Sequence, residues 1–170
     1  YFNSSGADLY YDYNMEQDIY INDNYLYLTD VTIVNNLAEY EAGGVYFYGD
    51  DISLVNVTIS DNESWTYTAG ISITNTHSPY SSFTSNFTDV LIENNKAINP
   101  EVPQFNTKGG GVSLDLDVDV NTTLDFSTVT ITNNEARLGG GMILDQSPND
   151  DTDLISYVNL SLIGNQAEKG

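Results

Sequence analysis

The sequence predicts an all-β fold, a single parallel β-helix of about five to six coils with three short strands in each coil. A motif in which Ile or Leu stands three positions before an asparagine recurs five times along the chain. In the first four copies, a glycine and an apolar run follow the motif. Apolar and polar residues alternate within the copies with the period of two that is typical of strands with one buried face. No stretch carries the apolar stripe of an amphipathic helix.

The five copies of the asparagine motif define columns of equivalent residues if each coil stacks on the previous one. Two columns are apolar and are expected to face inward, where their burial supplies most of the stabilising free energy. The third column is the final asparagine of each motif. We expect its amides to hydrogen-bond from coil to coil, and its backbone to take the left-handed conformation of a sharp corner. The columns are Val31, Val57, Val90, Val129 and Leu160; Ile33, Ile59, Ile92, Ile131 and Leu162; and Asn36, Asn62, Asn95, Asn134 and Asn165.

Glycines and short apolar runs complete each predicted coil. A glycine opens the strand after each asparagine corner, and we expect it to take a positive φ at the next bend. A separate short run before each motif, such as 26–28, is expected to form the remaining strand. Residues 6–10 are interpreted as a degenerate first copy of the glycine strand. The glycines are Gly44, Gly70, Gly111 and Gly141.

An antiparallel β-sandwich is the rival fold, since it also needs short alternating strands separated by turns. A sandwich gives no reason for the same order of aliphatic residue, asparagine and glycine to recur along the chain. The length of 170 residues suits one domain spanning 1–170. Because the chain starts at Tyr1 without Met or a signal peptide, we expect a fragment or repeat unit of a longer chain.

The repeated motifs resemble the right-handed parallel β-helix repeats of polymorphic outer-membrane proteins. That family carries a Phe-x-x-Asn motif and a glycine-glycine-alanine-aliphatic motif, and the resemblance covers about residues 26–170. It implies a right-handed coil and a secreted or cell-surface role, adhesive or structural, without catalytic residues. The first motif is matched, with Ile for Phe, by the segments that end at Asn36, Asn62, Asn95 and Asn134. The second is matched, without the alanine, at Gly43-Gly44-Val45, Gly110-Gly111-Val112 and Gly140-Gly141-Met142.

The composition argues against several classes of function. The chain carries 25 acidic side chains against four basic ones, a formal net charge of −21, and it has no cysteine. Binding of nucleic acid or of an anionic membrane is disfavoured, because both need Lys and Arg. The lack of cysteine excludes disulfides, cysteine nucleophiles and Cys-based zinc sites. The longest apolar runs have about four residues, too few to insert in a bilayer.

Six N-x-Ser/Thr sequons make N-glycosylation the first candidate modification. Asn56, Asn86 and Asn159 are expected at strand edges, where the side chain can face outward. Asn62 belongs to the asparagine column, where an inward amide cannot carry a sugar, so it is the weakest candidate. A chain rich in asparagine also generates several sequons by chance, so both interpretations stay open. The full set is Asn3, Asn56, Asn62, Asn86, Asn121 and Asn159.

Three alternating carboxylates, Asp115, Asp117 and Asp119, form the candidate cation site. Strand periodicity places them on one face, and the loop 145–153 holds further aspartates nearby. Hard oxygen ligands of this kind suit Ca²⁺, although the segment lacks the glycine and the final glutamate of an EF-hand loop. A solvated acidic face that prevents aggregation is the alternative. No other cofactor is expected.

Adjacent acids such as Asp50-Asp51 and Asp150-Asp151 suggest a polysaccharide hydrolase or lyase. Such enzymes commonly place Arg, Lys or His beside the acids to stabilise charge on the sugar. Neither Arg137 nor His77 recurs with a carboxylate at a spacing in the sequence that indicates a catalytic pair. The sequence also contains no nucleophile elbow, phosphate loop or dinucleotide motif. We therefore expect no enzymatic activity.

Tyrosines and open strand edges provide the functional expectation. Tyr46 and Tyr48 flank Phe47 and are expected to line the outer face of their strand, where tyrosine suits protein or sugar contacts. A solenoid ends in open strand edges that must be capped or paired. The sequence thus predicts a non-catalytic extracellular module, structural or adhesive, whose copies stack head to tail in a surface fibre or filament. A carbohydrate- or receptor-binding adhesin is the alternative.

Overall fold

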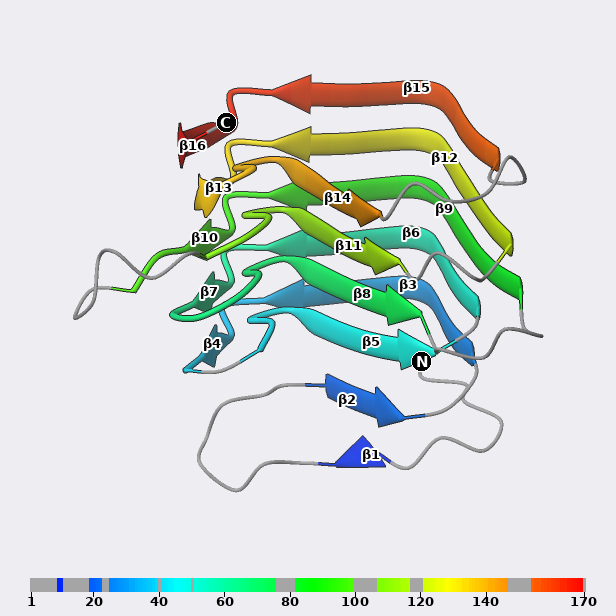
Figure 1. Cartoon of the computed structure of the whole chain (residues 1–170), viewed down its shortest axis with the longest axis horizontal. Helices are drawn as coiled ribbons and strands as arrows, with labels where there is room; N and C mark the ends of the chain where they lie inside the picture. Colours follow the sequence, from blue (N-terminus) through cyan, green and yellow to red (C-terminus); the bar gives the residue numbers. More distant parts are fainter. Residues whose placement is uncertain are drawn as a thin grey trace.

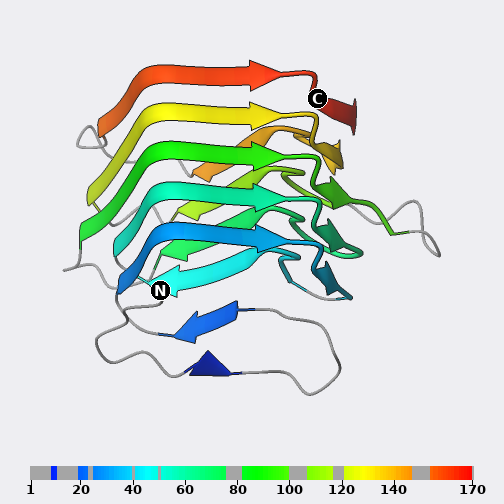
Figure 2. The same ribbon diagram turned by 180° about the vertical axis from the view of Figure 1, so that it is seen from behind.

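The described part of the chain is an all-β parallel β-helix (Figure 1). The structure is a computed structural model of the whole chain, and it describes residues 9–10, 19–22, 25–39, 41–49, 51–75, 82–99, 107–116, 121–146 and 154–169. The chain visits three sheets in turn, so that about five coils of three strands are stacked. Figure 2 shows the same stack from behind, with successive coils directly above one another. The predicted fold class is confirmed.

We name the three sheets after their strands. The long-strand sheet consists of β3 (Tyr25–Val34), β6 (Asp51–Ser60), β9 (Ser82–Glu93), β12 (Asn121–Thr132) and β15 (Leu154–Ile163). The short-strand sheet consists of β4 (Leu37–Ala38), β7 (Glu63–Ser64), β10 (Lys96–Ala97), β13 (Glu135–Leu138) and β16 (Gln166–Lys169). The glycine-strand sheet consists of β1 (Leu9–Tyr10), β2 (Ile19–Asn22), β5 (Val45–Gly49), β8 (Ile71–Asn75), β11 (Val112–Leu116) and β14 (Met142–Gln146).

The inward columns form one hydrophobic core along the stack. Ile33, Ile59, Ile92, Ile131 and Leu162 are paired in register through the five long strands. The four isoleucines are at most 6% exposed, whereas Leu162 is 54% exposed because no described strand lies beyond β15. Aromatic side chains extend the core in the same way: the ring of Phe126 packs edge to face on that of Phe87 at 5.1 Å and stacks on that of Tyr157 at 5.6 Å.

The third strand of each coil differs from the prediction. The run 26–28 and the motif that follows it belong to one continuous long strand, β3, which bends at Asp30. Asp30 has a φ of 57°, and the ladder with β6 skips it. A single left-handed residue therefore bends the strand without ending it. The remaining strand of each coil is the short strand after the asparagine, with two residues in β4, β7 and β10 and four in β13 and β16. The same bend recurs in every long strand, at Asp30, Asn56, Asp89, Thr128 and Asn159.

The asparagine corner is also built differently from the expectation. The left-handed backbone belongs to the residue before the final asparagine, with φ between 54° and 65° in all five copies. The final asparagine lies outside that region and turns its side chain inward. The expected left-handed conformation of the final asparagine is therefore wrong. The residues that take it are Asn35, Asp61, Asn94, Asn133 and Gly164.

The glycines that open the strands are required by close packing between coils. Gly44, Gly70, Gly111 and Gly141 are not among the residues with positive φ, so the expected reason for glycine there is wrong. A Cβ built on Gly70 would lie 2.1 Å from the carbonyl oxygen of Gly111 in the next coil. Only a residue without Cβ allows the backbones to approach so closely.

The N-terminal strand β1 is not a copy of the glycine strand. β1 runs antiparallel to β2, whereas β2 runs parallel to β5 with Ile19 beside Val45 and Ile21 beside Phe47. β2 is therefore the first copy, and the interpretation of residues 6–10 is wrong for Leu9 and Tyr10; residues 6–8 lie outside the described residues. The sequence does indicate that β2 is the first copy. Ile19-Tyr20-Ile21 alternates like its counterpart in β5 and precedes it by 26 residues, which is also the spacing between β5 and β8.

Candidate functional site

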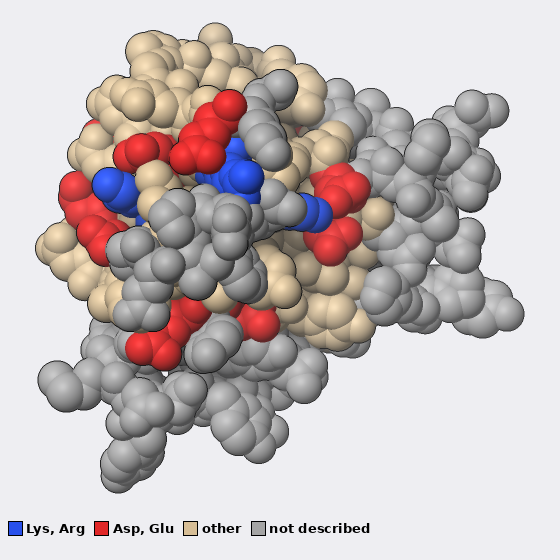
Figure 3. Space-filling model, turned by 60° about the vertical axis from the view of Figure 1, so that its left-hand side comes forward, with Lys and Arg blue, Asp and Glu red and all other residues tan. Residues whose placement is uncertain are grey.

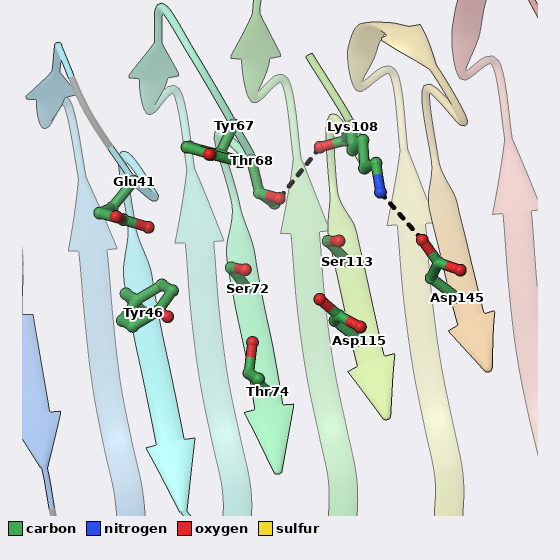
Figure 4. A pocket seen from close by; sticks show the side chains of 10 residues that line it. All are labelled: Glu41, Tyr46, Tyr67, Thr68, Ser72, Thr74, Lys108, Ser113, Asp115 and Asp145. Carbon is green, nitrogen blue, oxygen red and sulfur yellow. Dashed lines mark hydrogen bonds and ion pairs between the residues drawn. The ribbon is translucent and has the colours of Figure 1, made fainter. Parts of the chain in front are cut away.

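A groove on the outer face of the glycine-strand sheet is the candidate site (Figure 4). It has a volume of about 270 Å³ and crosses four strands, β5, β8, β11 and β14. Since the strands stack coil upon coil, the groove runs along the axis of the β-helix. It is lined by Glu41, Tyr46, Tyr67, Thr68, Ser72, Thr74, Lys108, Ser113, Asp115 and Asp145.

Strand alternation and register place the floor of the groove. The inward residues of β5, Val45 and Phe47, are fully buried, so Tyr46 between them points outward. Parallel pairing then puts equivalent outward residues side by side in two rows. One row is Tyr46, Ser72 and Ser113, and the other is Tyr48, Thr74, Asp115 and Asp145.

The rim of the groove comes from the loops that lead into the glycine strands. These loops contribute Glu41, Tyr67, Thr68 and Lys108. The Oγ1 of Thr68 donates a hydrogen bond to the carbonyl oxygen of Lys108 at 3.0 Å, which joins two successive loops. The Nζ of Lys108 lies 2.9 Å from Oδ2 of Asp145, so this lysine bridges the loop and strand β14 (Figure 4). The hydrogen bond from the ammonium to Asp145 raises the pKa of Lys108.

Glu41 gives the groove a pH-dependent group, because partial burial raises the pKa of its carboxyl group above the usual value. Since the folded-state pKa is raised, stability is greatest below the unfolded pKa and falls as pH rises through the folded pKa. We expect Glu41→Gln to become more stable than the native chain as pH rises through the folded-state pKa of Glu41. Below the unfolded-state pKa the two proteins should be equally stable. Denaturant titrations of both proteins from pH 3 to 7 check this. A gain that persists unchanged at the acid end would contradict the assignment.

Only part of the candidate calcium site belongs to the described residues. Asp115 is exposed in the groove and lies beside Asp145 in the ladder, while Asp117 and Asp119 lie outside the described residues. Among the residues that the structure describes, no group of three or more His, Cys, Asp or Glu side chains could hold a metal ion. The predicted calcium site at Asp115, Asp117 and Asp119 therefore stays a prediction.

The sequons occupy different environments. Asn56 and Asn159 stand at the exposed bends of β6 and β15, and Asn86 is exposed on β9. The Nδ2 of Asn56 donates a hydrogen bond to Oδ1 of Asp30 at 2.6 Å. Asn62 is fully buried, so a glycan on it would need to break the core. Asn3 and the side chain of Asn121 lie outside the described residues.

The five asparagines of the column are joined in a ladder through the interior. The Oδ1 of Asn95 accepts hydrogen bonds from the backbone N–H and the Nδ2 of Asn62, at 3.1 and 2.9 Å. Asn95 in turn donates from Nδ2 to Oδ1 of Asn134 at 2.9 Å and to the carbonyl of Ile59 at 3.0 Å. The same pattern links Asn36 to Asn62 and Asn134 to Asn165. The three inner amides, those of Asn62, Asn95 and Asn134, thus satisfy polar groups of both neighbouring coils.

Of the residues considered for catalysis, the structure describes Asp51 and Arg137, and neither is among the residues that line the groove. Asp50, Asp150, Asp151 and His77 lie outside the described residues. Arg137 lies on the short-strand sheet, where its Nε is 3.3 Å from Oε2 of Glu168. Figure 3 shows this face, with basic and acidic side chains next to one another. The basic side chains there are thus engaged with carboxylates, as in the pair of Lys96 with Glu135 at 3.7 Å.

These features define a β-solenoid of the parallel β-helix class with a polar and aromatic groove on one sheet. Comparison with family models, with curated proteins and with solved structures gives no match for this chain. The resemblance to polymorphic outer-membrane protein repeats therefore stays a prediction beyond the shared solenoid fold. The described residues contain no helix with the length and apolar character needed to cross a membrane.

The sequence singled out Tyr46 and Asp115 but not the rest of the groove. It placed Asp145 in a loop, which is wrong, because Asp145 belongs to strand β14 and pairs there with Asp115. The positions of Ser72 and Thr74 could have been predicted from the alignment of the repeats, since these residues pair with Tyr46 and Tyr48. The alignment does not predict the positions of Tyr67 and Lys108, because they belong to loops of different lengths. Tyr48, which was predicted together with Tyr46, is half-buried on the outer face but is not among the lining residues.

Proposed function

We propose that this chain is a non-catalytic structural module of an extracellular β-helix rod, and that its copies stack head to tail. The distribution of exposed apolar side chains carries this proposal. In the part of the chain that the structure describes, eight of the nine exposed large apolar side chains lie in the first or the last coil. They are Tyr25, Tyr27, Val34 and Leu37 at one end, and Tyr157, Val158, Leu162 and Ile163 at the other.

The last coil exposes core side chains that a further coil would bury. Leu162 continues the column of Ile131, yet it is 54% exposed, and Tyr157 continues the column of Phe126 and is 50% exposed. Burial of a Leu-sized side chain stabilises by about 1.5–3 kcal/mol. The two ends also leave edge strands without a described neighbour, β15 and β16 at one end and β3 and β4 at the other. Such edges favour pairing with another chain.

Register supports the head-to-tail arrangement. Val34 and Ile163 occupy the same outward position of the long-strand sheet, in its first and last strands. The three coils between them place Ser60, Glu93 and Thr132 at that position. A second copy stacked in register on β15 would set its Val34 directly above Ile163. The position is therefore apolar only where a junction between copies would cover it.

The junction would involve two of the three sheets. The long-strand and short-strand sheets end in parallel-paired strands, which another parallel strand can extend. The glycine-strand sheet ends in β1, whose direction is opposite to that of β2. The exposed sequons Asn56, Asn86 and Asn159, with the strongly acidic composition, support an extracellular location.

Sedimentation velocity over a range of protein concentrations tests the proposal. We expect the native chain to form assemblies that grow with concentration, since a head-to-tail contact does not close. Ile163→Glu and Val34→Glu should each weaken association at least about tenfold, because burial of an unpaired carboxylate opposes contact. Glutamate is compatible with the coil at this position, where Glu93 already stands.

Thr130→Glu is the matched control, since it adds the same charge to the outward face of a central coil. It should leave association unchanged. A native chain that stays monomeric at every concentration would overturn the stacking proposal. Association that Val34→Glu does not weaken would overturn the head-to-tail arrangement.

A further inference from the structure

Tyr67 is the exception to the distribution of exposed apolar side chains. It is 51% exposed, and it is the only large apolar side chain among the described residues that is exposed away from the two end coils. Stacking of copies does not account for it, because it lies in a central coil, next to β8. It lines the groove, and so does the half-buried Tyr46. The aromatic side chains therefore point to a ligand in the groove and not to the junction.

The polar groups of the groove suit a ligand rich in hydroxyl groups. Ser72, Thr74 and Ser113 bring hydroxyls that both donate and accept hydrogen bonds, and Asp115 brings carboxylate acceptors. These side chains come from adjacent strands, so the β-ladder holds their positions (Figure 4). In small-molecule sites, polar groups held in place beside aromatic side chains fix the orientation of the ligand.

The charge of the groove selects against anions. Glu41, Asp115 and Asp145 line it together with one cation, Lys108. The ammonium of Lys108 is already paired with Asp145 at 2.9 Å, so it is not available as an anion partner without losing that contact. Its charge also acts on Asp115, so one ammonium faces three carboxylates and the groove keeps a net negative charge. An anionic ligand would meet like charge there, which is destabilising.

The size and direction of the groove limit the ligand further. A cavity of about 270 Å³ is close to the lower limit of about 300 Å³ for small-molecule sites. Its lining residues come from four successive strands, β5, β8, β11 and β14 (Figure 4), so its shape suits an elongated ligand that lies along the stack. A sugar ring has the required character, because it presents an apolar C–H face to an aromatic ring and hydroxyls at its edge.

We propose that the groove binds an uncharged saccharide, with Tyr46 and Tyr67 as aromatic contacts and the strand hydroxyls and Asp115 as hydrogen-bonding partners. The binding is non-covalent and independent of the proposed stacking, because the lining residues belong to β5, β8, β11, β14 and the loops before them.

Titration calorimetry with defined oligosaccharides tests the proposal. The neutral probes are oligomers of glucose, mannose, galactose and N-acetylglucosamine, and the acidic probes are oligomers of galacturonic acid. We expect at least one neutral probe to bind and the acidic probes to bind at least about tenfold more weakly or not at all. Tyr67→Ala and Tyr46→Ala should each weaken the neutral probe at least about tenfold, since an aromatic contact and its buried area are lost.

Tyr27→Ala is the matched control, because Tyr27 is 46% exposed but belongs to β3, outside the groove. It should bind the neutral probe as the native chain does, and circular dichroism should show all three variants folded. Absence of binding by every neutral probe at millimolar concentration would overturn the proposal. So would preference for galacturonic acid oligomers, or equal loss of binding in Tyr27→Ala. Sedimentation of the same samples tells a failure of this site from a failure of stacking.

Discussion

Replacement of Gly70 by alanine is expected to destabilise the fold by at least about 4 kcal/mol. The added Cβ would lie 2.1 Å from the carbonyl oxygen of Gly111 and 3.2 Å from its Cα, so the clash is with backbone that cannot rotate away. The backbone at Gly70 is held on both sides, since its N–H donates to Gly110 at 3.0 Å and its carbonyl accepts from Val45 at 2.9 Å. Relief of the clash therefore breaks ladder contacts. Urea denaturation of Gly70→Ala measures the loss.

Gly139→Ala is the control that distinguishes a steric clash between coils from the cost of a left-handed backbone conformation. Gly139 has a φ of 57°, and the nearest atom to its added Cβ would be 3.0 Å away. The same substitution there is expected to cost about 1–2 kcal/mol, the usual cost of a left-handed alanine. If both variants lost stability equally, or if Gly70→Ala were neutral, the packing argument for the glycine column would be wrong.

The sequence was sufficient for the fold class because the repeat determines which residues share a column. Once Ile33, Ile59, Ile92 and Ile131 are aligned, the inward face and the order of the coils follow. The corners were harder, because two adjacent asparagines, as in Asn35-Asn36, give no indication of which one is left-handed. The copies Asp61-Asn62 and Gly164-Asn165 held the answer: the first position varies among residues that tolerate positive φ, and the second is always asparagine.

The groove could be predicted only where it rests on strands. Tyr46 is outward because Phe47 is inward, and register then carries Ser72 and Thr74 to its side. Tyr67 and Lys108 reach the groove through loops that differ in length from coil to coil, so no alignment of the repeats places them. Their position depends on contacts such as the hydrogen bond from Thr68 to the carbonyl of Lys108.

Replacement of Asn95 by alanine is expected to cost about 3–5 kcal/mol, because it removes the central amide of the buried ladder. The Oδ1 of Asn95 is the acceptor for two N–H groups of Asn62, and its Nδ2 is a donor to the carbonyl of Ile59. Asn95 and Asn62 are fully buried, so water does not replace these partners. Each buried polar group left unpaired costs about 1–3 kcal/mol. Urea denaturation of Asn95→Ala measures this loss.

Asn165→Ala is the control at the open end of the same column. The Oδ1 of Asn165 accepts from the backbone N–H and the Nδ2 of Asn134 at 3.0 and 3.1 Å, so it makes the same contacts to one neighbour as Asn95 does. It is only half-buried, however, and water can reach the groups that the substitution frees. We expect a loss of about 1 kcal/mol there. Equal losses in the two variants would mean that the ladder stabilises the protein through direct amide contacts alone, and that exclusion of water from the interior adds nothing.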